Sequence, residues 1–183
     1  MGPNWLVPVL VFAILIPLSL VAPRRVSGEP RAAQIAAMAL IAVVNIANVV
    51  SLGLLVAQLL TNGKAVTGPE LLTSAVAIWL TNVIVFSLWY WELDRGGPDD
   101  RLTAQHAPPD FLFPQMSVPG CASEHWSPQF VDYFYVAFTN ATAFSPTDTL
   151  PLTPWAKLLM LIQSAASLVT LAIVAGRAVN ILN

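Results

Sequence analysis

The sequence predicts an all-α integral membrane protein with four transmembrane helices, and a short re-entrant helix and loop between the third and fourth spans. Two observations concern composition: the chain of 183 residues is 56% hydrophobic, and only 10% of its residues are charged. That charged fraction is far below the roughly 25% of a soluble domain. The third observation is that several apolar runs approach or exceed the length of about 18 residues that indicates a membrane span.

Four apolar segments account for the predicted spans. Residues 1–70 hold two helices of unassigned role, and residues 71–183 hold the rest of the chain. We interpret the first segment as a retained span, because no positively charged side chain precedes it. The second is long enough to exceed a bilayer core of about 30 Å, so we expect it to tilt or project. The four segments are Trp5 to Ala22, Ala32 to about Leu60, 71–91 and 155–182.

The region between the third and fourth spans divides into three parts. Residues 92–128 are polar and proline-rich, and we expect them to form a loop outside the membrane. Residues 129–141 predict a helix that is too short to span a bilayer. Two Ser/Thr-Pro pairs, Ser127-Pro128 and Thr153-Pro154, predict the starts of the short helix and of the fourth span.

A short polar loop then connects the short helix to the fourth span. Irregular backbone survives at membrane depth only where it is buried in protein or lines a water-filled cavity. The loop therefore indicates a re-entrant element, and such elements commonly build pores. Its residues are Thr142, Ala143, Phe144, Ser145, Pro146, Thr147 and Asp148.

Part of this region resembles a known signature. Thr142 and Asp148 stand where the signature TTVGYGD has its first threonine and its closing aspartate. On these and further residues, the segment 133–180 resembles the pore module of the potassium-channel superfamily in its bacterial two-span form. The resemblance implies a pore helix over 129–141, a filter-like loop over 142–148 and an inner helix over 155–182. The further matching residues are Pro151, Thr153, Pro154, Ala156 and Lys157 after the loop, Tyr135 and Phe138 in the short helix, and Leu171 to Arg177 near the C-terminus.

The loop also departs from that signature, because Phe144-Ser145-Pro146-Thr147 replaces V-G-Y-G. Glycine permits φ > 0 without steric cost, whereas proline fixes φ near −65° and has no N–H. We therefore expect no stack of potassium-coordinating carbonyls. In a fourfold assembly, the hydroxyl groups of the loop would form polar rings, and Asp148, with Asp132 nearby, would add acidic rings that favour cations. Alternatively, Asp148 anchors the loop by packing behind it.

Polar residues recur along one face of the fourth span. Spacings of three or four place them on the same side of the helix. Such a stripe is typical of a water-filled cavity, and the alternative is hydrogen bonding between helices. Arg177 would oppose cations at the inner mouth unless its side chain snorkels or pairs. The predicted pore-lining residues are Gln163, Ser167, Thr170, Val174 and Arg177.

Other polar residues carry weaker signals. Amides within the second and third spans most often join helices by hydrogen bonds; these are Asn45, Asn48, Gln58 and Asn82. His106, Cys121, Glu124 and His125 match no strong zinc pattern, so we expect no metal site and no cofactor. A basic patch for nucleic acid and a reactive constellation for an enzyme are both missing from the sequence.

These observations predict a tetrameric ion channel subunit that conducts cations passively, with a monovalent cation as the permeant ion and with weak or altered selectivity. A single re-entrant loop cannot enclose a conduit, so the partners are three further copies in a homotetramer and the lipid bilayer. The expected location is a bacterial-type plasma membrane with cytoplasmic termini, although Arg24, Arg25 and Arg31 then lie outside, against the positive-inside rule. The alternatives are a non-conducting channel-like scaffold or regulatory partner and, more weakly, an anion conduit or a small-solute transporter.

Overall fold

The computed structural model describes residues 31–182, apart from the segments 63–66, 103–106, 124–125 and 143–147. Within that range, three helices are long and apolar enough to cross a membrane. They confirm the second, third and fourth predicted spans as helices of spanning length, whereas the first predicted span, Trp5 to Ala22, lies outside the described residues. The three helices are α2 (Arg31–Asn62), α3 (Gly68–Leu93) and α6 (Pro154–Leu182).

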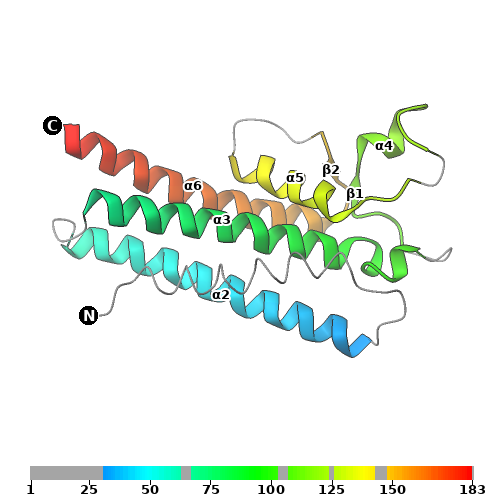
Figure 1. Cartoon of the computed structure of the whole chain (residues 1–183), viewed down its shortest axis with the longest axis horizontal. Coiled ribbons are helices and arrows are strands. Elements are labelled where there is room, and N and C mark those ends of the chain that lie inside the picture. The colour runs from blue at the N-terminus through cyan, green and yellow to red at the C-terminus, as the bar shows by residue number, and fades with distance from the viewer. Residues whose placement is uncertain (1–30, 63–66, 103–106, 124–125, 143–147, 183) are drawn as a thin grey trace.

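The three long helices lie side by side, and α3 contacts both of the others (Figure 1). The C-terminus of α3 and the N-terminus of α6 lie at one end, together with the short strands and α4 (Pro114–Ser117). We call this the loop end and define it by the described residues of 94–128 and 148–153. At the opposite end, the far end, α2 ends and α3 begins.

The core surrounds α3. Every side chain from Thr81 to Leu88 is buried, and α3 contacts α2, α5 and α6. In α2, by contrast, Ile41 and Val44 are buried while Ile46 and Val50 are exposed. An apolar surface of this kind is unusual on a soluble monomer and is what a lipid bilayer covers.

Local capping explains where the helices begin. Thr67 and Glu70 form a capping box at the start of α3. Thr153 caps α6, because its hydroxyl accepts a hydrogen bond from the Ala156 backbone N–H at 3.3 Å, as the Thr-Pro pair predicted. The short helix α5 begins at Phe130, later than the Ser127-Pro128 pair predicted. Its first turn is instead closed by the Asp132 carboxylate, which accepts from the backbone N–H of Gln129 at 2.7 Å.

The described residues of the loop end contain regular secondary structure. Two 3-10 turns, Asp94–Gly96 and Asp100–Leu102, follow α3. The strands β1 (Phe111–Leu112) and β2 (Leu150–Pro151) then pair in antiparallel fashion. This two-stranded ribbon was not predicted, because strands of two residues leave no periodic pattern in a sequence.

Candidate functional site

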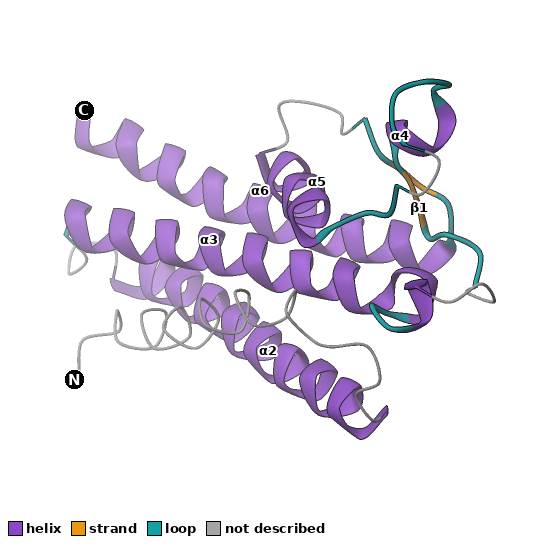
Figure 2. Ribbon diagram, turned by 45° about the vertical axis from the view of Figure 1, so that its right-hand side comes forward, coloured by secondary structure: helices purple, strands orange, loops and turns teal. Residues whose placement is uncertain are grey.

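The predicted short helix is α5 (Phe130–Thr142), with 13 residues and a length of about 20 Å. Tyr133, Val136, Ala137 and Ala141 are buried, and their spacing of three and four residues places them on one face. This face packs against α3 and α6 (Figure 2). One face of α5 is therefore buried against the rest of the chain.

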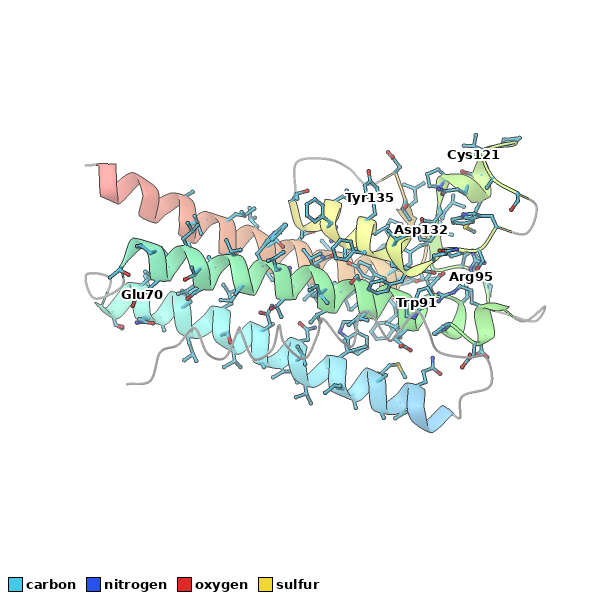
Figure 3. All side chains as sticks on the ribbon, viewed as in Figure 1. Glu70, Trp91, Arg95, Cys121, Asp132 and Tyr135 are labelled. Carbon is cyan, nitrogen blue, oxygen red and sulfur yellow. The ribbon has the colours of Figure 1, made fainter. Side chains whose placement is uncertain are left out.

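The other face of α5 is apolar, and much of it is exposed in the described part of the chain. It carries three aromatic rings, and Phe138 also makes an edge contact with Trp79 of α3 at a centroid distance of 5.5 Å. Figure 3 shows Tyr135 on the outer side of the helix. The exposed residues are Val131, Phe134, Tyr135 and Phe138.

A buried carboxylate lies beside the start of α5. Asp94 is 0% exposed, and its Oδ2 accepts a hydrogen bond from the Tyr133 hydroxyl at 2.5 Å. Its Oδ1 accepts from the backbone N–H of Asp110 at 2.8 Å. The charge of Asp94 is balanced by Arg95 and Arg101, whose nearest guanidinium nitrogens lie 3.6 and 3.7 Å from Oδ2.

Arg101 completes this cluster from the second 3-10 turn. Its guanidinium donates to the Tyr133 hydroxyl at 2.8 Å and to the Trp91 carbonyl at 3.2 Å. It also lies over the Trp91 ring, 4.3 Å from the centroid, where the π face attracts a cation. Burial raises the pKa of the Tyr133 phenol above its ordinary value, so the hydroxyl stays protonated and donates to Asp94. Figure 3 shows Trp91 and Arg95 together at the loop end.

Asp110 extends the polar contacts from this cluster to α6. One carboxylate oxygen accepts from the backbone N–H of Arg95 at 3.2 Å, and the other accepts from the Thr153 hydroxyl at 2.6 Å. Because Thr153 also caps α6, the end of α3, the start of α5 and the start of α6 are held by one continuous set of hydrogen bonds.

A second polar cluster lies at the other end of α5. Gln163 of α6 is 0% exposed, and its Nε2 donates to the carbonyl of Ala137 at 2.8 Å. Its Oε1 accepts from the Tyr90 hydroxyl at 2.6 Å and from Asn140 Nδ2 at 2.8 Å. One amide therefore joins α3, α5 and α6.

Further contacts hold the last turn of α5. Asn140 Nδ2 donates to the carbonyl of Met160 at 3.0 Å, and Asn140 Oδ1 accepts from the Ser164 hydroxyl at 3.0 Å. From α3, the Trp79 indole N–H donates to the carbonyl of Ala141 at 3.3 Å. These hydrogen bonds hold the C-terminal end of α5 against α3 and α6.

Three of the residues predicted to line a pore are buried inside the chain. Gln163 and Ser167 are 0% exposed and Thr170 is 2% exposed. Ser167 accepts from Asn82 Nδ2 of α3 at 2.8 Å, and the Thr170 hydroxyl donates within its own helix. This placement favours the alternative reading of the stripe, hydrogen bonding between helices. Val174 is half-buried, and the side chain of Arg177 lies outside the described residues.

The filter-like loop is described only at its two ends. Thr142 is the last residue of α5, and its hydroxyl donates to the carbonyl of Thr139 at 2.8 Å. Asp148 is exposed and precedes β2 at the loop end. Ala143, Phe144, Ser145, Pro146 and Thr147 lie outside the described residues.

The remaining candidates from the sequence are the amides of the spans and four residues that were weighed as metal ligands. The expectation that span amides join helices is confirmed for Asn82, which also donates to the carbonyl of Gln163 at 3.1 Å, and for Asn48, which donates to the carbonyl of Ile78 at 3.3 Å. Cys121 is exposed at the loop end, whereas His106, Glu124 and His125 lie outside the described residues. In the described part of the chain, no group of three or more His, Cys, Asp or Glu side chains is arranged to hold a metal ion.

Sequence reasoning missed the charged cluster of Asp94, Arg101 and Tyr133. The available signal was that charges follow the apolar run of α3 at once, in Glu92-Leu93-Asp94-Arg95. Charges so close to the end of a span either mark the membrane surface or pair inside the protein, and only the folded chain shows that Asp94 and Arg101 pair.

Comparisons with models of protein families, with curated proteins and with solved structures find no match to this chain. The resemblance of residues 133–180 to a potassium-channel pore module therefore stays a prediction.

Proposed function

We propose that this chain is one subunit of a tetrameric ion channel that conducts cations passively, with weak or altered selectivity compared with potassium channels. The observation that carries the proposal is the path of the chain through α5. This helix starts near the loop end and ends beside the middle of α3, and the chain is back at the loop end by β2 (Figure 1).

The contacts at both ends of α5 support this path. Near its start, Tyr133 contacts Asp94, directly after α3. Near its end, Ala141 contacts Trp79, which lies 14 residues (93 minus 79) before the end of α3, or about 21 Å along that helix. Since α3 has 26 residues, α5 reaches about the middle of a spanning helix.

The return of the chain is held at a definite place. Phe111 of β1 pairs with Pro151 of β2, and the backbone N–H of Leu152 donates to the carbonyl of Asp110 at 2.8 Å. A segment that enters and leaves a spanning bundle at the same end is what a re-entrant helix requires. In hydrocarbon, such a segment must be buried in protein or line a water-filled cavity.

The charges near this segment favour cations. The C-terminal end of a helix carries a partial negative charge, and α5 ends beside Trp79, about halfway along α3. Asp148 adds an exposed carboxylate at the loop end. In a fourfold assembly, each feature is repeated around the axis, and a ring of acidic groups attracts cations to a pore mouth.

The assembly follows from the shape of one subunit. One re-entrant segment cannot surround a conduit, so copies must close a ring. The exposed aromatic face of α5 offers a surface for a neighbouring copy. We place the loop end outside a bacterial-type plasma membrane and the termini in the cytoplasm, with the first predicted span returning the N-terminus to that side.

A second candidate function is a non-conducting channel-like scaffold. The specific observation in its favour is that the polar stripe of α6 is buried, whereas the exposed side of that helix carries apolar residues such as Leu161 and Leu168. A cavity lined by such residues alone would tend to lose its water, and dewetting closes a pore to ions.

Flux from proteoliposomes tests the two candidates. Potassium, sodium and chloride gradients are applied separately to the wild type, to Asp148→Asn and to the control Glu70→Gln, which removes a charge at the far end but keeps a capping-box residue. We expect cation flux in the wild type, and a decrease of about fivefold to tenfold in Asp148→Asn alone, which corresponds to about 1 kcal/mol of lost attraction.

The other outcomes are equally informative. Chloride flux would favour the anion conduit and direct attention to Arg177. An absence of all flux from protein shown to be tetrameric in lipid would favour the scaffold. A chain that stays monomeric in lipid would contradict both the ring and the channel.

A further inference from the structure

The buried amide of Gln163 is placed to control the geometry of α5. We propose that Gln163 is a positioning residue, which sets the depth and the rotation of the last turn of α5 and thereby the starting point of the loop after Thr142. Its consequence for ion selectivity rests on the proposed channel function, whereas its effect on α5 can be measured without any flux.

The amide group of Gln163 uses most of its hydrogen-bonding capacity. A primary amide offers two N–H donors and an oxygen with two acceptor sites. In Gln163, the oxygen receives two hydrogen bonds, of 2.6 and 2.8 Å, and the nitrogen donates one of 2.8 Å. The residue is fully buried, and in a low-dielectric interior such bonds are stronger and a lost partner is more costly than in water.

Two of these hydrogen bonds join Gln163 to the last turns of α5. Ala137 and Asn140 lie three residues apart, one above the other on the side that faces α6. A slip of α5 by one residue would shift both groups by 1.5 Å along the axis and turn them by about 100°. Neither bond would survive that change, so the pair of contacts defines both the depth and the rotation of the helix.

Gln163 is itself held by hydrogen bonds from α3. Asn82 of α3 donates to the backbone carbonyl of Gln163 at 3.1 Å, and Tyr90 of the same helix donates to its side chain. The positions of Gln163 and Asn140 are thus referred to α3, the most enclosed helix of the bundle.

The consequence concerns the residues that follow. Asn140 is two residues from Thr142, where α5 ends and the filter-like loop begins. The position from which the loop starts is therefore set by the turn that Gln163 holds. A variant at this position should change how the loop meets ions, and should leave the exposed surface available to a neighbouring copy unchanged.

Hydrogen–deuterium exchange of the full chain in lipid nanodiscs tests the structural part. Gln163→Met keeps the length of the side chain but removes its hydrogen bonds. We expect the backbone amides of the last turn of α5 to exchange at least about tenfold faster in this variant, because two of the lost hydrogen bonds reach this helix. Thr170→Val is the matched control, because it removes a buried hydroxyl of α6 that bonds only within its own helix in the described contacts.

A double variant separates positioning from general destabilisation. Tyr90→Phe removes the hydroxyl that Gln163→Met leaves without its partner, and removing both partners of a buried bond costs less than removing one. We expect the double variant to regain part of the protection of α5. Gln163→Glu keeps the acceptor for Tyr90 and Asn140 but places a carboxylate oxygen against the Ala137 carbonyl, so it should also accelerate exchange, and it serves as the test if Gln163→Met does not fold. Equal exchange in wild type, Gln163→Met and Gln163→Glu would overturn the proposal.

Flux measurements test the functional consequence. In a conducting wild type, we expect Gln163→Met to change the potassium-to-sodium permeability ratio by about threefold or more and Thr170→Val to leave it unchanged, since ions of different size respond to displaced coordinating groups. An unchanged ratio beside accelerated exchange would overturn the role in selectivity. If the wild type itself does not conduct, the channel proposal fails, while the exchange result still decides whether Gln163 positions α5.

Discussion

Tyr133 illustrates how one hydroxyl group satisfies a buried ion pair. It donates to Asp94 and accepts from Arg101, while its ring lies 5.1 Å from the Arg101 guanidinium carbon. A buried ion pair is stable only when its remaining donors and acceptors are satisfied. The phenol therefore supplies hydrogen bonds of the kind that water supplies to an ion pair at a protein surface.

We expect Tyr133→Phe to lower the free energy of unfolding in detergent by about 1–3 kcal/mol, because a carboxylate and a guanidinium both lose a buried partner. The control is Tyr135→Phe in the same helix, where the side chain is 55% exposed and a change below about 0.5 kcal/mol is expected. Thermal or denaturant unfolding of both variants provides the measurement. Equal effects would mean that the hydroxyl of Tyr133 contributes nothing specific.

At the scale of elements, the turn after α3 determines how that helix meets α2. Arg95, Gly96 and Gly97 all have positive φ, of 56°, 85° and 112°. The turn brings the Gly96 carbonyl to Gln34 of α2, which donates to it at 3.0 Å. Glycine at 97 suits the backbone angle, and a Cβ there would meet the end of the Gln34 side chain, which would have to move from its contact with Gly96.

Gly97→Ala should therefore reduce stability by about 1–3 kcal/mol and loosen the N-terminal end of α2. Gly120→Ala is a useful comparison, since Gly120 also has positive φ, of 75°, but a Cβ there would meet nothing within 4 Å. We expect the smaller loss for Gly120→Ala, measured as the midpoint of unfolding. If Gly97→Ala is no worse than Gly120→Ala, the contact with Gln34 is of little importance.

At the scale of the whole molecule, the three long helices separate the loop end from the far end. Cys121 is exposed at the loop end, and Thr61 is exposed where α2 ends at the far end. If α3 crosses a membrane, these two positions are separated by it. The proposed orientation puts Cys121 outside the cell.

A membrane-impermeant maleimide tests this arrangement on intact cells that express the chain. Cys121 is the single cysteine, so wild type should be labelled directly and Cys121→Ser should not. In the Cys121→Ser background, Thr61→Cys should react only after permeabilisation. The reverse pattern would invert the proposed orientation, and labelling of both sites in intact cells would contradict α3 as a span.

The limits of the helices were predicted more closely than the partners of their side chains. The limits of α3 and α6 agree with the sequence within a few residues, and α5 is shifted by only one residue at each end from 129–141. The Thr153 cap was also predictable, because a cap depends on neighbours within one turn. The polar stripe of Gln163 and Ser167 was recognised as a shared face, but the sequence left open whether that face lines a cavity or forms hydrogen bonds with other helices.

The sequence by itself determined that this chain has long apolar helices and one short helix between them. Apolarity, length and helical periodicity are local properties, which neighbouring residues express whatever the rest of the chain does. Only the tertiary structure decided what each polar side chain meets. Asn82 and Ser167 are 85 residues apart, and Arg101 and Tyr133 are 32 apart. Periodicity states which residues share a helix face, but the partner of that face depends on how distant helices pack against one another.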